Sequence, residues 1–264
     1  MEMLNLIQNF PHQLEEAVRI GSSVEWKPVR GSIQNIVILG LGGSAFGGEI
    51  IKSYCFKQCP LPIQICRGYE IPACITEHTL VIASSYSGNT EETLMTLTQA
   101  IQRNAQIVCI TSGGKVAELA KQHGLTCFQL PVGYPPRTAA GFSIIQQLFI
   151  LHHVGLIGEF LPEVESSIQL LRNFGTEHFS LAETVAKDCY QRIPVVYASD
   201  LYESVAIRFR QQIDENAKQL CWHHVVPEMN HNELVGWELP TEILKQLTVI
   251  FFRSQLDHER VAIR

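Results

Sequence analysis

Long apolar runs and clusters of basic residues are both missing from this sequence. No window approaches about 18 consecutive apolar residues, so a membrane-spanning helix is not expected. Met1 to Phe10 lack a basic segment followed by an apolar stretch, and we therefore expect no secretory signal and a cytoplasmic location. Lys plus Arg number 20 against 26 Asp plus Glu, a formal charge of −6. This balance disfavours nucleic-acid and anionic-membrane partners, so any bound anion needs a local site.

Signals for disulfides and metal ligands are also weak, although the chain has eight cysteines. Three residues separate Cys55 from Cys59, but no second pair at metal-ligand spacing accompanies them. Several cysteines lie inside apolar runs such as residues 107–110, and we expect reduced thiols in the core. The full set is Cys55, Cys59, Cys66, Cys74, Cys109, Cys127, Cys189 and Cys221.

The remaining composition is that of an ordinary globular protein. Hydrophobic residues make up 46% and charged residues 17%, with 18 Gly and 12 Pro, which excludes disorder and collagen. At about 150 residues per domain, 264 residues form one large domain or two modest ones.

Strand-like and helix-like segments alternate along the first part of the chain. Short runs rich in β-branched residues predict strands at residues 33–39, 61–66, 79–84, 106–110 and 126–130. Helices are predicted at residues 45–54, 91–103, 115–123 and 140–154. This alternation predicts an α/β fold with a parallel sheet covered by helices on both faces.

The rest of the chain begins a second unit of the same kind. Residues 161–191 have a helical pattern with a break near 173–176, followed by strands at 193–198 and 246–253 around a helix at 203–218. Residues 257–264 look like the approach to another strand. We therefore predict a first domain at residues 1–160, linker helices at 161–192 and a partial second domain at 193–264.

Two loops are candidates for ligand binding, and the first is rich in glycine. The segment from Gly40 to Ala45 matches the dinucleotide pattern G-x-G-x-x-G/A. That pattern also requires an acidic residue at the end of the second strand, where this chain has Arg67 followed by Gly68. Arg67 could face a 2′-phosphate instead, but a dinucleotide site is the weaker reading.

The second loop offers four Ser and Thr hydroxyls at the end of a predicted strand, in the segment from Ser84 to Thr90. Free N–H groups, a helix dipole and hydroxyls would all point at one spot, which suits an anion. The alternative is that Ser87 and Thr90 only cap the helix while Asn89 serves the turn, but capping uses a single hydroxyl. Gly43 and Ser44 lie at an equivalent strand end and would face the same crevice.

These motifs resemble the sugar isomerase (SIS) domain, the phosphosugar-binding module of sugar isomerases and related regulators. The similar segments are GGSA at residues 42–45 and SYSGNTEET at residues 85–93. Three later segments, PPRTAA, DENAK and NHNELVGW, resemble in that order the bifunctional phosphoglucose/phosphomannose isomerases. The resemblance covers the chain from about residue 36 to residue 237.

The resemblance implies a fold, an assembly and an activity. The fold would be two αβα-sandwich SIS domains, the second incomplete here, in a homodimer whose active site draws on both subunits. The activity would interconvert glucose 6-phosphate and mannose 6-phosphate with fructose 6-phosphate through a cis-enediol, without metal or cofactor. The phosphate would be held by Gly43, Ser44, Ser85, Ser87 and Thr90. Family members extend further and carry an active-site Lys on their final helix, which leaves turnover by this chain open.

Three further residues receive catalytic roles from the resemblance. Arg137 would stabilise the enediolate, Glu215 would move a proton between C1 and C2, and His231 would open the sugar ring. Isomerisation needs these types of group: a carboxylate base, a cation near the charged oxygen and an acid for the ring oxygen. His223 and His224 with His231 could form a metal cluster, but no carboxylate or Cys lies at a recognisable ligand spacing.

A second function from a different class stays open at this point. The chain could be a non-catalytic SIS module that binds a phosphosugar and regulates a partner. The set of Arg137, Glu215 and His231 favours the enzyme, because a sensor has no need of them.

Overall fold

The structure is a computed structural model that describes residues 3–27 and 30–263. The chain divides into two compact units, Met1–Asn173 and Phe174–Arg264. Residues 161–192, predicted as linker helices, contain α7 (Leu161–Arg172) and α8 (Thr176–Cys189). Helix α7 packs against α2 (Phe10–Ser23) in the first unit, whereas α8 belongs to the second.

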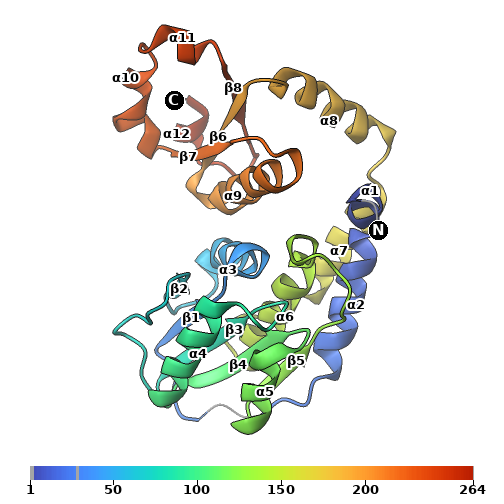
Figure 1. Ribbon diagram of the computed structural model, residues 1–264, viewed down its shortest axis with the longest axis vertical. Coiled ribbons are helices and arrows are strands. Elements are labelled where there is room, and N and C mark those ends of the chain that lie inside the picture. Colours follow the sequence, from blue (N-terminus) through green and yellow to red (C-terminus); the bar gives the residue numbers. More distant parts are fainter. Residues whose placement is uncertain (1–2, 28–29, 264) are drawn as a thin grey trace. The chain divides into compact units, whose positions relative to one another are not determined.

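The first unit is built around a parallel sheet of five described strands in the order β2-β1-β3-β4-β5 (Figure 1). All four pairings are parallel, which confirms the predicted α/β class. The predicted strands begin and end within two residues of the observed ones. The bounds are β1 Asn35–Leu39, β2 Ile63–Cys66, β3 Thr79–Ser84, β4 Gln106–Thr111 and β5 Thr126–Gln129.

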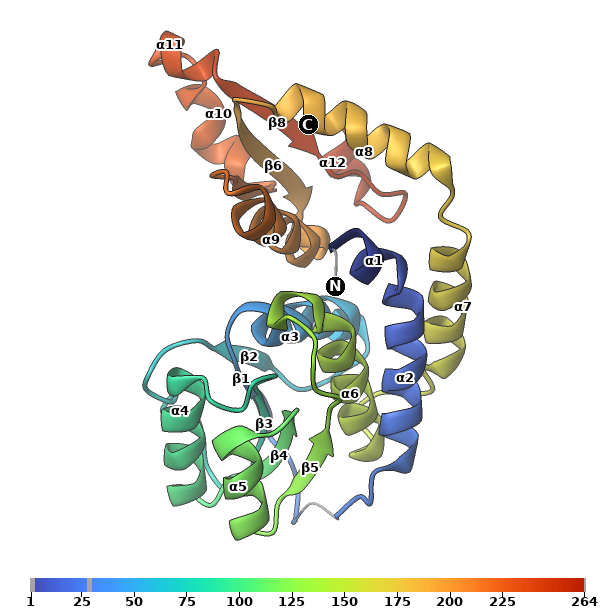
Figure 2. The same cartoon turned by 45° about the vertical axis from the view of Figure 1, so that its right-hand side comes forward.

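Helices cover both faces of this sheet, because its inner strands are apolar on both sides. In β1, Ile36 and Ile38 join the core beneath α2, α3 and α6, and Val37 and Leu39 join the core beneath α4 and α5. All four side chains are fully buried. Figure 2 shows the two groups of helices on opposite sides of the strands. The helices are α1 Met3–Gln8, α3 Gly42–Tyr54, α4 Glu91–Gln102, α5 Gly114–Gln122 and α6 Ala140–His153, with 3-10 turns η1 Cys55–Lys57 and η2 Pro136–Thr138.

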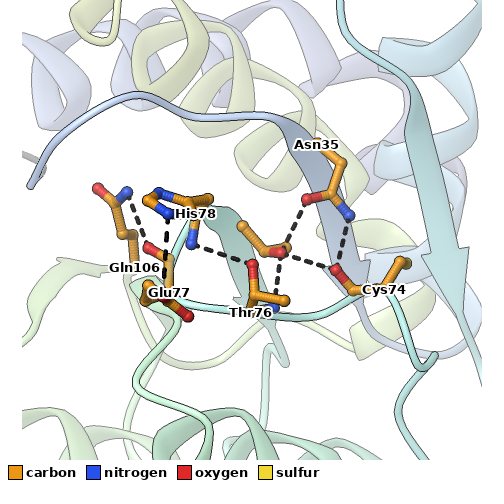
Figure 3. A network of polar contacts seen from close by, with 7 residues as sticks. Asn35, Cys74, Thr76, Glu77, His78 and Gln106 are labelled. Atoms are coloured by element: carbon orange, nitrogen blue, oxygen red, sulfur yellow. Dashed lines mark hydrogen bonds and ion pairs between the residues drawn. The ribbon is translucent and has the colours of Figure 1, made fainter.

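A polar network holds together the amino ends of three neighbouring strands (Figure 3). The hydroxyl of Thr79, which begins β3, donates to Oδ1 of Asn35, which begins β1 (2.8 Å). Nδ2 of Asn35 donates to the carbonyl of Cys74, and Nε2 of Gln106 on β4 donates to the carbonyl of Glu77. These hydrogen bonds fix the strands relative to one another at their amino ends. The loops at the carboxyl edge take no part in this network and are available for binding.

The second unit contains a smaller parallel sheet with the described strand order β7-β6-β8. The central strand β6 packs on α9 through Val196 and Ala198, and on the opposite face through Val195 and Tyr197. Its strands are β6 Ile193–Ser199, β7 Trp222–Val226 and β8 Leu247–Phe251. Its other elements are η3 Asp200–Tyr202, α9 Glu203–Gln212, η4 Ile213–Ala217, η5 Glu228–His231, α10 Glu233–Gly236, α11 Thr241–Leu244 and α12 Glu259–Ile263.

Several details of the second unit differ from expectation. The helix predicted at 203–218 ends at Gln212 and continues as the π-helical turn η4. Strand β7 was not predicted, and the segment expected to approach a strand contains α12.

One cysteine lies outside the predicted core. Cys74 is exposed, because it lies in the loop between β2 and β3 rather than in a strand. The other described cysteines are buried or half-buried free thiols. No helix in the described ranges has the length and apolar character needed to cross a membrane.

Candidate active site

A loop rich in hydroxyls follows β3, at the centre of the first sheet. This hydroxyl loop runs from Ser85 to Thr90 and leads into α4. Ser85 is 2% exposed, and its N–H donates to the carbonyl of Ile110 on β4 (3.0 Å). The hydroxyl of Ser85 is hydrogen-bonded to the hydroxyl of Thr90 (2.9 Å) and accepts the N–H of Gly88 (3.1 Å). The loop is thereby held in one shape with its hydroxyls grouped.

These hydroxyls are not used to cap α4. Thr90 occupies the N-cap position, but its side chain makes no capping hydrogen bond. Ser87 is exposed, and its hydroxyl accepts the N–H of Asn89 (3.3 Å). The first N–H groups of any helix have no partner within it and carry the positive end of its dipole. In the Ser85–Thr90 pair one hydroxyl donates to the other, so the accepting hydroxyl keeps a proton that it can donate to an anion.

The loop after β4 and the first turn of α5 fix the backbone of the hydroxyl loop. The N–H (2.9 Å) and the hydroxyl (2.5 Å) of Ser112 both donate to the carbonyl of Tyr86, and the N–H of Val116 donates to the carbonyl of Gly88 (3.0 Å). Gly88 has a φ of +68°, and a Cβ there would lie 1.8 Å from the carbonyl oxygen of Gly113. Only glycine fits this close approach of two loops.

Gly43 and Ser44 stand in the first turn of α3, after β1, which pairs with β3. The hydroxyl of Ser143 on α6 joins this segment to the end of β3. It lies 3.2 Å from the hydroxyl of Ser84 and donates to the carbonyl of Ser44 (3.3 Å). A Cβ on Gly43 would lie 2.9 Å from the carbonyl oxygen of Pro136. The structure therefore places the five predicted phosphate residues at one edge of the sheet, with Gly43 beside η2.

Arg137 lies in η2, the turn that packs against Gly43, and it is half-buried. Tyr86 holds the segment that leads to this turn. Its hydroxyl donates to the carbonyl of Pro131 (2.8 Å) and accepts the N–H of Tyr134 (2.9 Å). From the sequence we assigned no role to Tyr86. The only sign of one is that Tyr86 lies between two serines of the hydroxyl loop. Tyr86 thus connects the hydroxyl loop to the segment that leads to Arg137.

Glu215, the predicted proton carrier, lies in η4 at the end of α9, and its side chain is exposed. The neighbouring Asp214 is already engaged, because its carboxylate accepts the N–H of Cys221 (3.1 Å). Burial lowers the pKa of Arg208 on α9, and the charge of Glu215 opposes that shift. The carboxylate and the guanidinium are thus close enough to interact. Short π-helical segments are often found at functional sites.

His231, the predicted ring-opening group, is the exposed last residue of η5. Glu233, two residues later, contacts the hydroxyl of Tyr197 on β6 and Nδ1 of His224 on β7. Burial first, and then the hydrogen bond to Glu233, raise the pKa of Tyr197 far above its ordinary value, so its hydroxyl stays protonated. The carboxylate of Glu233 is therefore occupied within the fold.

Glu215 and His231 flank opposite ends of β7. Glu215 precedes the amino end of this strand, and His231 follows its carboxyl end. The strand has five residues, which at about 3.3 Å per residue span about 16 Å. Sequence separation alone did not reveal this, because β7 was not predicted.

The described residues contain no group of three or more His, Cys, Asp or Glu side chains suited to a metal ion. His223 and His224 are successive residues of β7 and point to opposite faces of the sheet, so these two imidazoles do not share a site. Arg67, considered for a 2′-phosphate, is paired with Glu49 of α3.

Comparison with known families assigns a domain to each part of the chain. Residues 32–154 match the SIS domain, and residues 179–264 match the bacterial phospho-glucose isomerase C-terminal SIS domain. The C-terminal domain of glucosamine-fructose-6-phosphate aminotransferase from Francisella tularensis has a similar fold, with a TM-score of 0.73 at 14% identity, over 94% of this chain and 75% of that one.

Two curated relatives are similar over most of their length. A bifunctional phosphoglucose/phosphomannose isomerase of Caldicellulosiruptor bescii is 36% identical over 99% of this chain and 80% of the relative. One of Aquifex aeolicus with the same name is 32% identical over 91% of this chain and 74% of the relative. The chain belongs to the bifunctional phosphoglucose/phosphomannose isomerase family.

Proposed function

We propose that this protein is an aldose–ketose isomerase that interconverts glucose 6-phosphate and mannose 6-phosphate with fructose 6-phosphate. The hydroxyl loop of the first unit is the observation that carries the proposal. It groups hydroxyls and N–H donors at a helix N-terminus, which is a site for a phosphate in a protein without basic clusters. Family membership supports the choice of hexose phosphates.

The phosphate would be held by Gly43 and Ser44 from the start of α3 and by Ser85, Ser87 and Thr90 from the loop before α4. Both segments begin helices at the carboxyl edge of one parallel sheet, so two helix dipoles contribute. This arrangement binds the part of the substrate that does not react, and it leaves the sugar free for the catalytic groups.

The remaining proposed residues would carry out the proton transfers. His231 gives a proton to the ring oxygen while the C1 hydroxyl loses one, which opens the ring to the aldehyde. Glu215 takes the acidic proton from C2, and Arg137 stabilises the negative charge that the resulting enediolate carries on O1. A proton passes from the C2 hydroxyl to O1 through the cis-enediol, and Glu215 returns its proton to C1 to form the ketose. The proton moves within the sugar, so the overall reaction consumes no cofactor, and we propose that none is needed.

We further propose that the protein acts as a homodimer whose site uses both subunits. The positions of Glu215 and His231 at opposite ends of β7, about 16 Å of strand, support this. Each substrate would then use Glu215 from one copy and His231 from another. Phosphorylated hexoses are cytoplasmic metabolites, and we propose that the enzyme acts there, in glycolysis and related carbohydrate metabolism.

A coupled assay for fructose 6-phosphate, run separately with glucose 6-phosphate and mannose 6-phosphate, tests this function. We expect product from both aldoses, and the same rate after dialysis against a chelator. Binding of either aldose phosphate without conversion would instead identify the non-catalytic regulatory module.

Calorimetry tests the phosphate site separately from catalysis. Unphosphorylated glucose should bind at least about a hundredfold more weakly than glucose 6-phosphate, because it loses two or three charge-assisted hydrogen bonds of roughly 1.5 to 3 kcal/mol each. Equal affinity for the two sugars would contradict the assignment of the hydroxyl loop.

A further inference from the structure

The segment that carries His231 has little apolar packing of its own. It consists of η5, Asn232 and the four-residue helix α10. In η5 only Met229 is buried, and in α10 Leu234 and Val235 are exposed, the latter by 77%. The position of His231 must therefore depend on the residues that fasten this segment to the sheet on either side.

On the amino-terminal side the fastening is apolar. Met229 is 6% exposed and lies in a cluster with Val195, Tyr197 and Val226. On the carboxyl-terminal side it is polar, through Glu233. The imidazole of His231 stands between these two attachments, two residues from each.

The polar attachment joins three elements. Glu233 contacts the Tyr197 hydroxyl of β6 and Nδ1 of His224 on β7, and Nε1 of Trp237 donates to the Tyr197 hydroxyl (3.1 Å). The N–H of Glu233 also donates to Oδ1 of Asn232, which caps α10. Glu233, the first residue of α10, and Trp237, the residue that follows this helix, thus both contact the buried Tyr197.

We propose that Glu233 is a positioning residue for His231, acting through Tyr197 and His224. This inference rests on the proposed function, because it assumes that His231 opens the sugar ring. Glu233 itself does not touch the substrate in this scheme. It holds the segment so that His231 keeps one position beyond the carboxyl end of β7.

Kinetics with two substrate forms separates this role from general destabilisation. In Glu233→Ala, kcat for cyclic glucose 6-phosphate should fall by about 10- to 100-fold, the usual effect of a small misplacement of a catalytic group. KM should stay close to that of the wild type, since the hydroxyl loop that would hold the phosphate is unchanged. An analogue without the C4 and C5 hydroxyls cannot close to a five- or six-membered ring, and it should react at the wild-type rate. Tyr197→Phe should show the same pattern with a smaller effect.

Two controls make the result specific. Glu238→Ala removes an exposed glutamate five residues further along and should leave both substrates unaffected. Adding Glu233→Ala to His231→Ala should slow the cyclic substrate no further, because the two residues act as a unit. Equal slowing of the cyclic and open substrates, additional slowing in the His231→Ala background, or wild-type kinetics of Glu233→Ala would each overturn the proposal.

A measurement without turnover keeps this inference distinguishable from the proposed function. The imidazole NMR signals of His231, assigned by their loss in His231→Ala, should shift or broaden in Glu233→Ala and not in Glu238→Ala. Unchanged signals in Glu233→Ala would refute the positioning role even in an active enzyme. A wild-type protein that converts neither aldose would refute the proposed function, and the signals would still report on the attachment.

Discussion

At the scale of single residues, neighbouring groups decide which carboxylate is available for catalysis. Asp214 accepts a backbone N–H and Glu233 contacts a tyrosine and a histidine, whereas the side chain of Glu215 is exposed. A base must reach the carbon acid without first giving up a structural hydrogen bond. This contrast favours Glu215 over its two rivals.

Glu215→Gln should therefore slow proton transfer strongly and leave binding intact. Glutamine keeps the size of the side chain but cannot accept the proton, so kcat should fall by roughly 10²-fold to 10⁴-fold. Calorimetry should give a nearly unchanged affinity for glucose 6-phosphate. Near wild-type turnover would transfer the role to Asp214 or Glu233.

His223 predicts a pH dependence of stability. Burial, with Arg210 and His224 nearby, lowers its pKa from 6.5 to about 4, although Glu203 lies 4.0 Å from its Nε2. Above pH 6.5 the residue is neutral in both the folded and the unfolded chain. As the pH falls from 6.5 towards 4, only the unfolded chain takes up the proton, so stability is lost over this range.

The unfolding temperature of His223→Gln, followed from pH 7 to pH 4, checks this expectation. Glutamine does not titrate, so the variant should lose fewer degrees over that interval than the wild type. Parallel curves for the two proteins would show that His223 is not held neutral by the fold.

Residue types alone could not separate the three histidines of this region. His223, His224 and His231 look equivalent in the sequence, and only the resemblance to a family selected His231. The structure distinguishes them by their elements, since two belong to β7 and one to the turn that follows it.

At the scale of elements, the hydroxyl loop depends on the loop beside it, and Gly88 tests this. Gly88→Ala would place a Cβ 1.8 Å from the Gly113 carbonyl at a φ of +68°. Gly124 is a matched control, because its φ is +62° and nothing lies within 4 Å of a Cβ there. Gly124→Ala should cost about 1 to 2 kcal/mol for the left-handed conformation alone and leave binding unchanged.

Gly88→Ala should cost more than this control and should also weaken the binding of glucose 6-phosphate, since the two loops must separate. Chemical denaturation gives the stability and calorimetry gives the affinity. If both variants lose the same stability and bind equally well, the contact between the two loops has no role in the site.

The first unit was predictable from the sequence because its inner strands are apolar on both faces. Residues 79–84 are all buried, and their predicted bounds were confirmed. Strand β7 escaped prediction because it lies at an edge, with Trp222 45% exposed and two histidines in its centre. The π-helical turn η4 was missed for another reason. The spacing of apolar residues predicts a helix but does not show where one of its turns contains an extra residue.

At the scale of the whole molecule, the proposal that two copies share each site predicts complementation. Glu215→Gln and His231→Ala should each be poorly active on cyclic glucose 6-phosphate. A mixed dimer would contain one site with an intact Glu215 from one subunit and an intact His231 from the other. Mixing and reassembling the two variants should restore roughly a quarter of wild-type activity, because half of the dimers are mixed and each has one working site. No recovery would place both groups in a site made by one chain.

The central claim is that this chain moves a proton between two carbons of a phosphorylated hexose. Isomerisation of glucose 6-phosphate in D₂O, followed by NMR, tests it most directly. Because the side chain of Glu215 is exposed, the proton that it takes from C2 can exchange with solvent before it is returned, so deuterium should appear at C1 of fructose 6-phosphate and at C2 of the aldoses. Glu215→Gln should form both product and label at least about a hundredfold more slowly. Fructose 6-phosphate formed without any deuterium, or bound glucose 6-phosphate that is never converted, would contradict the account.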